Sequence, residues 1–243
     1  MRSILVTGGT GTLGRPTVGR LRAAGHQVRI FSRQPGPDRF VGDLTTCAGL
    51  AAAVEGIDVI VNLATSLGRR DERQARNLLD AARVAGTPHV VQMSIVAVDR
   101  IPMPYYRTKL AVERLVEESG VQFTILRATQ FHHLIDQIFR AQRFLPVLLA
   151  PAVILQPIAV EDVAGRIVEL VAAAPANGRV ADIGGPERSR VPDLAGLWKR
   201  ARGSHRPTVP VRVPGRTFRT FATAGPLVDG TPYGQITFAE YLA

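Results

Sequence analysis

The chain has 243 residues, which is long enough for one large α/β domain with a substantial hydrophobic core. Its formal net charge is +10, but all except two of the 30 basic residues are arginines, scattered without a dense run or interleaved aromatic residues. This distribution argues against a nucleic-acid-binding face and is better explained by a biased composition together with an anionic cofactor.

Three features of the sequence bear on the location of the protein. Residues 1–3 lead directly into an apolar strand, so we expect no signal peptide. The longest apolar run, 144–155, is too short to span a bilayer and contains Pro146 and Pro151. Cys47 is the only cysteine, which excludes a disulfide framework and a cysteine-based zinc site. We therefore expect a cytoplasmic protein without a membrane partner.

A glycine-rich stretch follows the first apolar run. Residues 6–15 read Val-Thr-Gly-Gly-Thr-Gly-Thr-Leu-Gly-Arg, between a predicted buried strand at 4–6 and a predicted helix at 12–24. The glycines fit the dinucleotide fingerprint in two registers, starting at Gly8 or at Gly9, and the helix N-terminus then faces the phosphates. A plain glycine-rich turn is the alternative. The residues expected to bind the cofactor here are Thr7, Gly8, Gly9, Thr10, Gly11, Thr12, Leu13, Gly14 and Arg15.

The second predicted strand, 27–32, ends where a dinucleotide-binding unit meets the adenosine ribose. An acid at this point binds the 2′-hydroxyl of NAD, whereas this chain has Ser32 followed by Arg33. Arginine attracts a 2′-phosphate and can bind it with two hydrogen bonds, and Arg15 is a second candidate contact. These residues favour NADP over NAD, with NAD still possible; the alternative is that both arginines are solvated surface residues.

A third predicted strand, 40–44, is short and ends in Asp43 and Leu44. Both residues are candidate cofactor contacts, because they lie at the end of a strand. The Asp43 carboxylate can accept a hydrogen bond from the adenine amino group. The alternative interpretation makes Asp43 the N-cap of a predicted helix at 46–55.

The next predicted strand, 57–62, ends in Asn62, followed by Leu63 and Ala64. Backbone and small side chains at this point can line the cofactor ribose, so we count these three residues as cofactor contacts. Residues 70–85 then show the apolar periodicity of an amphipathic helix.

The residues with catalytic potential follow the fifth predicted strand, 89–94. Ser94 ends that strand, and open parallel sheets bind ligands at this edge. Tyr105 and Lys109 lie four residues apart at the start of a predicted helix, so they share one face. A lysine charge lowers the pKa of a nearby tyrosine, which makes the phenol usable as an acid or base, while the ammonium can bind the nicotinamide ribose. Two alternatives stay open: Tyr105 as a packed ring, or Tyr106 as the ring that faces the nicotinamide.

In this order, the motifs resemble those of the short-chain dehydrogenase/reductase superfamily, and most of all its atypical, NmrA-like NAD(P)H-binding branch. The motifs are 7–14, 42–44, 62–64, Ser94 and the Tyr105/Lys109 pair, supported by Arg33 and 126–131. The resemblance covers about residues 1–200. It implies a Rossmann-type doubly wound parallel α/β sheet of seven strands with a small C-terminal substrate-binding region. It also implies catalytic roles for Ser94, Tyr105 and Lys109, although the asparagine of the usual catalytic set cannot be placed.

The second half begins with a predicted strand at 121–126. By analogy with the family, Thr129 and Phe131 are expected beside the nicotinamide end of the cofactor. His132 and His133 are neighbours on a predicted helix, so their side chains do not face one site, and we interpret them as non-catalytic surface residues at the start of the helix.

The later residues are expected to complete one domain, 1–243, with the substrate region built mainly from 130–160 and 185–243. No metal-ligand spacing accompanies the histidines, so we expect no metal. Glu161 and Asp162 begin a predicted helix, where acids stabilise the N-terminus.

The sequence thus predicts an NADP-preferring oxidoreductase that reduces a small carbonyl or quinone-like substrate, with Ser94 orienting the carbonyl and Tyr105 donating the proton. Two alternatives stay open: a non-catalytic NAD(P)H-binding redox sensor or regulator, and an enzyme related to nucleotide-sugar epimerases. The expected partner is a small molecule, not a nucleic acid or a membrane, and the sequence leaves the oligomeric state open.

Overall fold

A computed structural model describes residues 1–87, 89–212, 214–223 and 225–243. The chain divides into two compact units. Unit 1 comprises Met1–Ser94, Pro104–Arg127 and Val163–Ala181. Unit 2 comprises Ile95–Met103, Ala128–Asp162 and Asp182–Ala243. Each unit is described by itself below.

A seven-stranded sheet forms the centre of unit 1, in the order β3-β2-β1-β4-β5-β6-β9. Its strands are β1 (Ser3–Thr7), β2 (Gln27–Ser32), β3 (Arg39–Val41), β4 (Val59–Asn62), β5 (His89–Ile95), β6 (Phe123–Ala128) and β9 (Gly178–Arg179). The strand order reverses between β1 and β4, the point at which doubly wound sheets bind ligands. The predicted Rossmann-type fold is confirmed.

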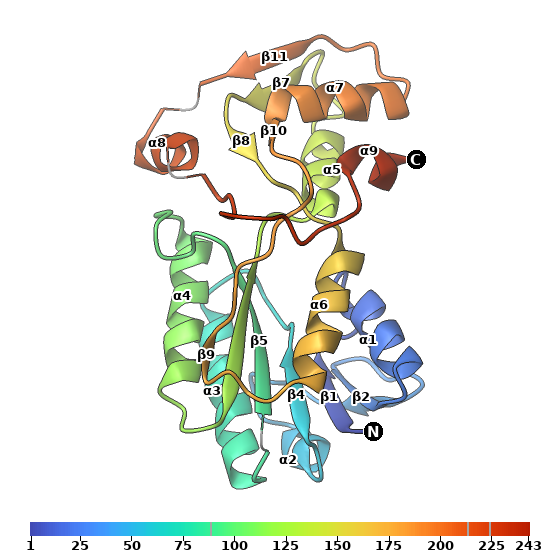
Figure 1. The fold of residues 1–243 in the computed structure, drawn as a ribbon, viewed down its shortest axis with the longest axis vertical. Helices are drawn as coiled ribbons and strands as arrows, with labels where there is room; N and C mark the ends of the chain where they lie inside the picture. The colour runs from blue at the N-terminus through green and yellow to red at the C-terminus, as the bar shows by residue number, and fades with distance from the viewer. Residues whose placement is uncertain (88, 213, 224) are drawn as a thin grey trace. The chain divides into compact units, whose positions relative to one another are not determined.

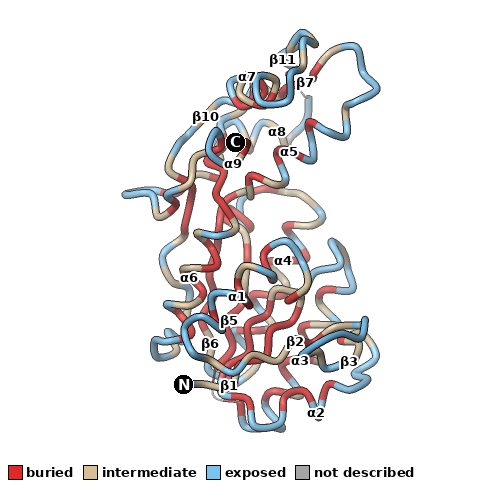
Figure 2. Tube along the Cα trace, turned by 90° about the vertical axis from the view of Figure 1, so that its right-hand side faces the viewer, coloured by how far each residue is buried: buried red, intermediate tan, exposed pale blue. Residues whose placement is uncertain are grey.

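Helices cover both faces of this sheet, because each helix has one apolar stripe to bury. Figure 1 shows α3 (Arg70–Val84) and α4 (Pro104–Glu117) on one side, with α1 (Gly14–Ala23) and α6 (Val160–Ala172) on the other. Leu5, Ile60 and Val90 of the sheet belong to one buried cluster with Leu78 of α3 and Val116 of α4. Figure 2 shows β1, β5 and β6 mostly buried, while the edge strand β3 is largely exposed.

The segment after β3 differs from the prediction. Helix α2 covers only Leu50–Val54 instead of 46–55, and strand β3 ends at Val41. The reason is local, since Cys47 and Gly49 have φ angles of 63° and 69°, which a right-handed helix does not accept. Asp43 is therefore not the N-cap of a helix: its Oδ1 accepts a hydrogen bond of 2.6 Å from the Thr45 N–H.

Unit 2 has its own core. Phe139 of α5 (His132–Ala141) packs on Trp198 of α7 (Val191–Ala201), and both join Phe238 of α9 (Phe238–Leu242) in one buried cluster. Trp198 Nε1 donates a 2.7 Å hydrogen bond to Asp136. The other elements are β7 (Leu148–Pro151) with β11 (Thr208–Val211), β8 (Ile154–Leu155) with β10 (Ser189–Arg190), and α8 (Arg216–Thr223).

Unit 2 contains both stretches expected to form a substrate region, 130–160 and 185–243. That they bind a substrate stays a prediction, as does the grouping of the whole chain as one domain. Within the described ranges, every helix falls short of the length and hydropathy that crossing a bilayer requires.

Candidate active site

A chain of buried polar side chains links the carboxyl ends of three strands. Thr7 of β1 lies opposite Asn62 of β4 in the sheet register, and its Oγ1 donates a 2.6 Å hydrogen bond to Asn62 Oδ1. Asn62 Nδ2 in turn donates to Gln92 Oε1 of β5 at 2.7 Å. These hydrogen bonds hold the neighbouring strands β1, β4 and β5 together near their carboxyl ends. Contact of Thr7 and Asn62 with a cofactor stays a prediction.

The glycine loop packs its backbone against other backbone, as a dinucleotide loop must. Gly8 has a φ of 69°, and a Cβ there would lie 2.8 Å from the Leu63 carbonyl carbon and 2.9 Å from the Ala64 nitrogen. A Cβ on Gly14 would lie 2.6 Å from the Gly9 Cα. Helix α1 begins directly after Leu13, whose side chain cannot accept a hydrogen bond, so this N-terminus suits an anionic phosphate. The loop therefore fits the predicted cofactor.

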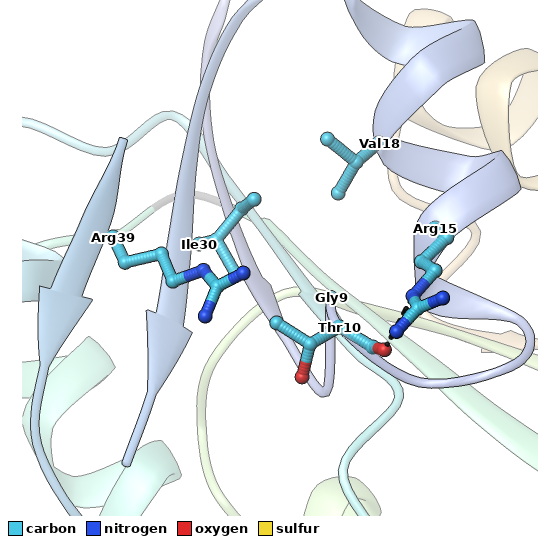
Figure 3. Close-up of a pocket in the computed structure, with 6 residues that line it drawn as sticks. All are labelled: Gly9, Thr10, Arg15, Val18, Ile30 and Arg39. Atoms are coloured by element: carbon cyan, nitrogen blue, oxygen red, sulfur yellow. Dashed lines mark hydrogen bonds between the residues drawn. The ribbon is translucent and has the colours of Figure 1, made fainter. Parts of the chain in front are cut away.

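A cavity of about 170 Å³ lies beside this loop and has an arginine on each side (Figure 3). Its lining is Gly9, Thr10, Arg15, Val18, Ile30 and Arg39. Arg15, from the first turn of α1, donates a 3.0 Å hydrogen bond from Nε to the Thr10 carbonyl. Arg39 enters from β3 and donates to the Pro35 carbonyl at 3.2 Å. Sequence reasoning missed Arg39, because nothing in the local pattern shows that β3 brings it to the glycine loop.

Arg33 and Asp43, a cation and an anion, form the second part of the predicted adenosine end. Arg33 is exposed, and Ser32 Oγ accepts a 3.1 Å hydrogen bond from the Gln34 N–H. The hydrogen bond from the Thr45 N–H is the main cause that lowers the pKa of Asp43, and Arg33 and Arg70 lower it further. The carboxylate of Asp43 is thus an acceptor in a positive environment, and its contact with an adenine stays a prediction.

Tyr105 and Lys109 are brought together as predicted, on one face of α4. Lys109 Nζ lies 5.8 Å from the centroid of the Tyr105 ring. Tyr105 is half-buried, whereas Tyr106 is only 5% exposed and meets the Tyr105 ring edge-on. Tyr105 Oη lies 3.4 Å from Thr65 Oγ1, in the loop after β4. The half-buried position favours Tyr105 over Tyr106 as the ring that reaches a ligand.

Sequence reasoning missed Asp71, which controls the charges around this tyrosine. Lys109 Nζ is 3.8 Å from Asp71 Oδ2, and the two side chains are 8% and 2% exposed. Burial lowers the pKa of Lys109, while the Asp71 carboxylate opposes this shift. Asp71 is one of two acidic residues in the first turn of α3. Acidic residues are common at this position because they interact favourably with the helix dipole, so nothing in the sequence indicated a further role.

The expected effect of Lys109 on Tyr105 is wrong. Burial is the main cause that raises the pKa of Tyr105, and the Asp71 carboxylate raises it further. The Lys109 ammonium, which was expected to lower this pKa, lies 3.8 Å from the Asp71 carboxylate. The resting site therefore holds Tyr105 as a neutral phenol.

Ser94 ends β5 as predicted, but its hydroxyl is not open to a ligand. The residue is 3% exposed, and its Oγ is fully buried without a hydrogen-bond partner in the described part of the chain. Its role toward a carbonyl oxygen stays a prediction. Thr65, in contrast, is an exposed residue next to Tyr105.

The remaining predicted residues belong to unit 2, where they have structural contacts. Thr129 Oγ1 donates a 2.5 Å hydrogen bond to the Gln156 carbonyl, and Phe131 is the N-cap residue of α5. The predicted surface position of His132 is wrong, because this residue is buried and its ring packs against Phe238 and Tyr241. Asp162 accepts hydrogen bonds from the N–H groups of Gln235 and Ile236. Cofactor contacts of Thr129 and Phe131 stay predictions.

Comparison with known sequences gives a family and several relatives. A family model described as NAD(P)H-binding matches residues 8–174. Photosystem II assembly factor Ycf39 of Cyanophora paradoxa is 32% identical over 146 residues, which are 53% of this chain and 46% of the relative. A (4-alkanoyl-5-oxo-2,5-dihydrofuran-3-yl)methyl phosphate reductase of Streptomyces griseus is 33% identical over 138 residues, 53% of this chain and 48% of the relative. The chain spans about half the length of the curated relatives it matches.

Comparison with solved structures supports the fold over the whole chain. An NADPH-dependent quinone oxidoreductase from Escherichia coli, solved in complex with NADPH, superposes with a TM-score of 0.80 at 18% identity. The match covers 98% of this chain and 98% of that chain. The family model confirms the predicted NAD(P)H-binding family, and the structural match supports the predicted fold.

Proposed function

The chain belongs to the NAD(P)H-binding family, and we propose that it is an NADP-preferring enzyme that reduces a small carbonyl or quinone-like molecule. One observation carries the proposal. The loop after β4 contacts the glycine loop through Leu63, against which Gly8 packs, and approaches Tyr105 through Thr65, two residues further on. The glycine loop, our candidate for binding the pyrophosphate, and the Tyr105 phenol therefore both meet the loop after β4 within unit 1.

The chain's own residues have defined tasks in this proposal. The glycine loop and the α1 N-terminus bind the pyrophosphate, and the buried Lys109 is the candidate to hold the nicotinamide ribose. Tyr105, kept neutral by burial and by Asp71, donates its proton to the carbonyl oxygen. When bound, the reduced cofactor would supply the hydride.

The preference for NADP rests on three arginines near the predicted adenosine end. Arg15 and Arg39 face the cavity beside Gly9 and Thr10, and Arg33 follows β2. A 2′-phosphate would meet guanidinium groups there, whereas the 2′-hydroxyl of NAD would lack a carboxylate partner at the end of β2. The names of the quinone oxidoreductase and the furanyl phosphate reductase agree with a reducing function.

A non-catalytic role is the second candidate, and one observation favours it. The Ser94 hydroxyl, which the family resemblance assigns to catalysis, is fully buried and has no hydrogen-bond partner in the described part of the chain. One relative is named an assembly factor. Such a protein would bind the cofactor without consuming it.

Calorimetric titration with NADPH and NADH, followed by turnover assays, tests the proposal. We expect tighter binding of NADPH and oxidation of NADPH in the presence of menadione, 9,10-phenanthrenequinone or simple aldehydes. Tight NADPH binding without any turnover of the panel would support the second candidate. Interconversion of a nucleotide sugar by a chain that retains its cofactor would instead show an epimerase.

A further inference from the structure

Both oxygens of the Asp71 carboxylate have polar partners, and two of these partners, Thr65 and Lys109, also contact Tyr105. Its Oδ1 accepts hydrogen bonds from the backbone N–H and the hydroxyl of Ser66, both at 2.6 Å. Its Oδ2 accepts the Thr65 hydroxyl at 2.6 Å and lies 3.8 Å from Lys109 Nζ. A capping acid at an exposed helix end needs none of these partners. The arrangement joins the loop after β4, α3 and α4 at one buried carboxylate.

The hydroxyl of Thr65 has one proton and two lone pairs, and each has a partner. The proton is donated to Asp71 Oδ2. One lone pair accepts the Leu67 N–H at 3.1 Å, and Tyr105 Oη lies 3.4 Å away at the other. Because the threonine proton is already bound to Asp71, the remaining hydrogen bond must be donated by Tyr105. The phenol is therefore held in its protonated form.

We propose that Thr65 and Asp71 are positioning residues that hold Tyr105 as a proton donor, so that the site is set for reduction. This inference rests on the proposed function. In the step, a hydride adds to the carbonyl carbon, the Tyr105 O–H bond breaks, and its proton forms the new O–H bond of the product. The phenolate left behind recovers a proton from water, since Thr65 and its loop are exposed.

The charges around the tyrosine agree with this assignment. Asp71 from α3 and Lys109 from α4 are the charged groups that face Tyr105, and Glu113 of α4 adds a further negative charge near Lys109. The Asp71 carboxylate, together with burial, disfavours a phenolate and raises the pKa of Tyr105. A hydrogen bond donated by Thr65 would lower that pKa, but the Thr65 proton is bound to Asp71.

An ultraviolet titration of the Tyr105 phenol tests the proposal without any turnover. The signal of Tyr105 is the difference between the chain and its Tyr105→Phe variant, measured in the unchanged background and with Asp71→Asn. We expect Asp71→Asn to increase the acid dissociation constant of the phenol about tenfold or more, because a negative charge is lost and Lys109 loses its balance. Asp80→Asn on the same helix, exposed and paired only with Arg83 at 3.4 Å in the described chain, is the matched control and should change nothing. An unchanged titration in Asp71→Asn would overturn the proposal.

Substitutions of Thr65 show whether Thr65 or Tyr105 is the donor in the hydrogen bond between them. This test remains available if Asp71→Asn fails to fold. Thr65→Val removes the acceptor of the phenol proton, so the dissociation constant should rise, and Thr65→Ser should restore the original value. A lower acid dissociation constant of the phenol in Thr65→Val would show that Thr65 donates to the phenolate, and would overturn the proposal.

Kinetics with NADPH and menadione separate this inference from the proposed function. In Asp71→Asn the alkaline limb of kcat should move to lower pH, with KM for menadione nearly unchanged. If the unchanged chain does not turn over any member of the quinone and aldehyde panel, the reductase function fails. A shifted phenol titration in that case would still support the positioning of Tyr105 by Thr65 and Asp71.

Discussion

Gly14 lies so close to Gly8 that a methyl group on Gly14 would overlap the carbonyl oxygen of Gly8. Gly8 belongs to the loop between β1 and α1, and Gly14 is the first residue of α1. The Gly8 carbonyl also accepts the Gly11 N–H at 3.0 Å. A side chain on Gly14 would therefore force the backbone of the loop to move. A change of side-chain rotamer could not relieve the overlap, because the overlapping atoms are backbone atoms.

Gly14→Ala should abolish measurable NADPH binding and destabilise the fold by about 1–3 kcal/mol, as overpacking of a close contact does. Gly19→Ala is the matched control on the same helix, because nothing lies within 4 Å of a Cβ there. It should stabilise the chain by up to about 1 kcal/mol through helix propensity and leave binding unchanged. Thermal unfolding and calorimetry of the two variants check this, and equal effects would contradict the close-packing argument.

Arg39→Gln should weaken NADPH binding about 10- to 100-fold and leave NADH binding nearly unchanged, because only NADPH carries a 2′-phosphate for a charged hydrogen bond. Arg22→Gln is the control, since Arg22 lies on α1 nearby and forms an exposed ion pair with Asp38 at 3.2 Å. Calorimetric titration of both cofactors measures the effect. If Arg39→Gln weakens the two cofactors equally, the cavity beside Gly9 does not bind the phosphate.

Arg33→Asp should also weaken NADPH more than NADH, by about 1.5–3 kcal/mol, because the cation is replaced by an anion that repels a phosphate. The side chain is exposed, so the fold should be unaffected. The ratio of the two dissociation constants is the measurement. An equal loss for both cofactors would show that Arg33 does not contact the 2′-phosphate.

Tyr105→Phe should lower kcat by about 10²- to 10⁴-fold with little change in NADPH affinity, because only the proton donor is removed while the ring is kept. Tyr106→Phe should have a far smaller effect, since Tyr106 is buried and points about 100° away around α4. Steady-state kinetics with NADPH and a quinone, together with cofactor dissociation constants, distinguish the two. An inactive Tyr106→Phe beside an active Tyr105→Phe would reverse the assignment.

His89 should make folding stability depend on pH. Its ring is 2% exposed, lies 2.9 Å from Thr124 Oγ1, and has a pKa lowered from 6.5 to about 4, chiefly by burial. The unfolded chain takes up a proton on this ring near pH 6.5, whereas the folded chain resists until about pH 4. Stability should therefore fall by up to about 3 kcal/mol as the pH decreases through this window.

Urea unfolding at pH 7 and pH 4.5 measures that dependence in the chain and in His89→Gln. The variant is expected to be less stable at pH 7 but to lose less stability on acidification, since it lacks the titrating ring. An identical loss in both proteins would show that other groups cause the acid sensitivity.

The fold, and the candidate residues that belong to a short local motif, could be predicted from the amino-acid sequence. The glycine spacing, the apolar strands and the four-residue interval between Tyr105 and Lys109 are all patterns within short stretches, so the periodicities of helices and strands reveal them. The same reasoning was wrong about the helix at 46–55, where positive φ angles at Cys47 and Gly49 delay the start to Leu50.

The arrangement of charges in the candidate site could not be predicted in this way, because it depends on contacts between residues far apart in the chain. Arg39 comes to the glycine loop from β3, and Asp71 comes to Lys109 from α3, over separations that no local pattern encodes. The sign of the Tyr105 pKa shift depends on this geometry, because burial of the phenol raises its pKa and the Asp71 carboxylate raises it further. Burial and long-range approach set these electrostatics, and both properties exist only after the strands and helices have packed.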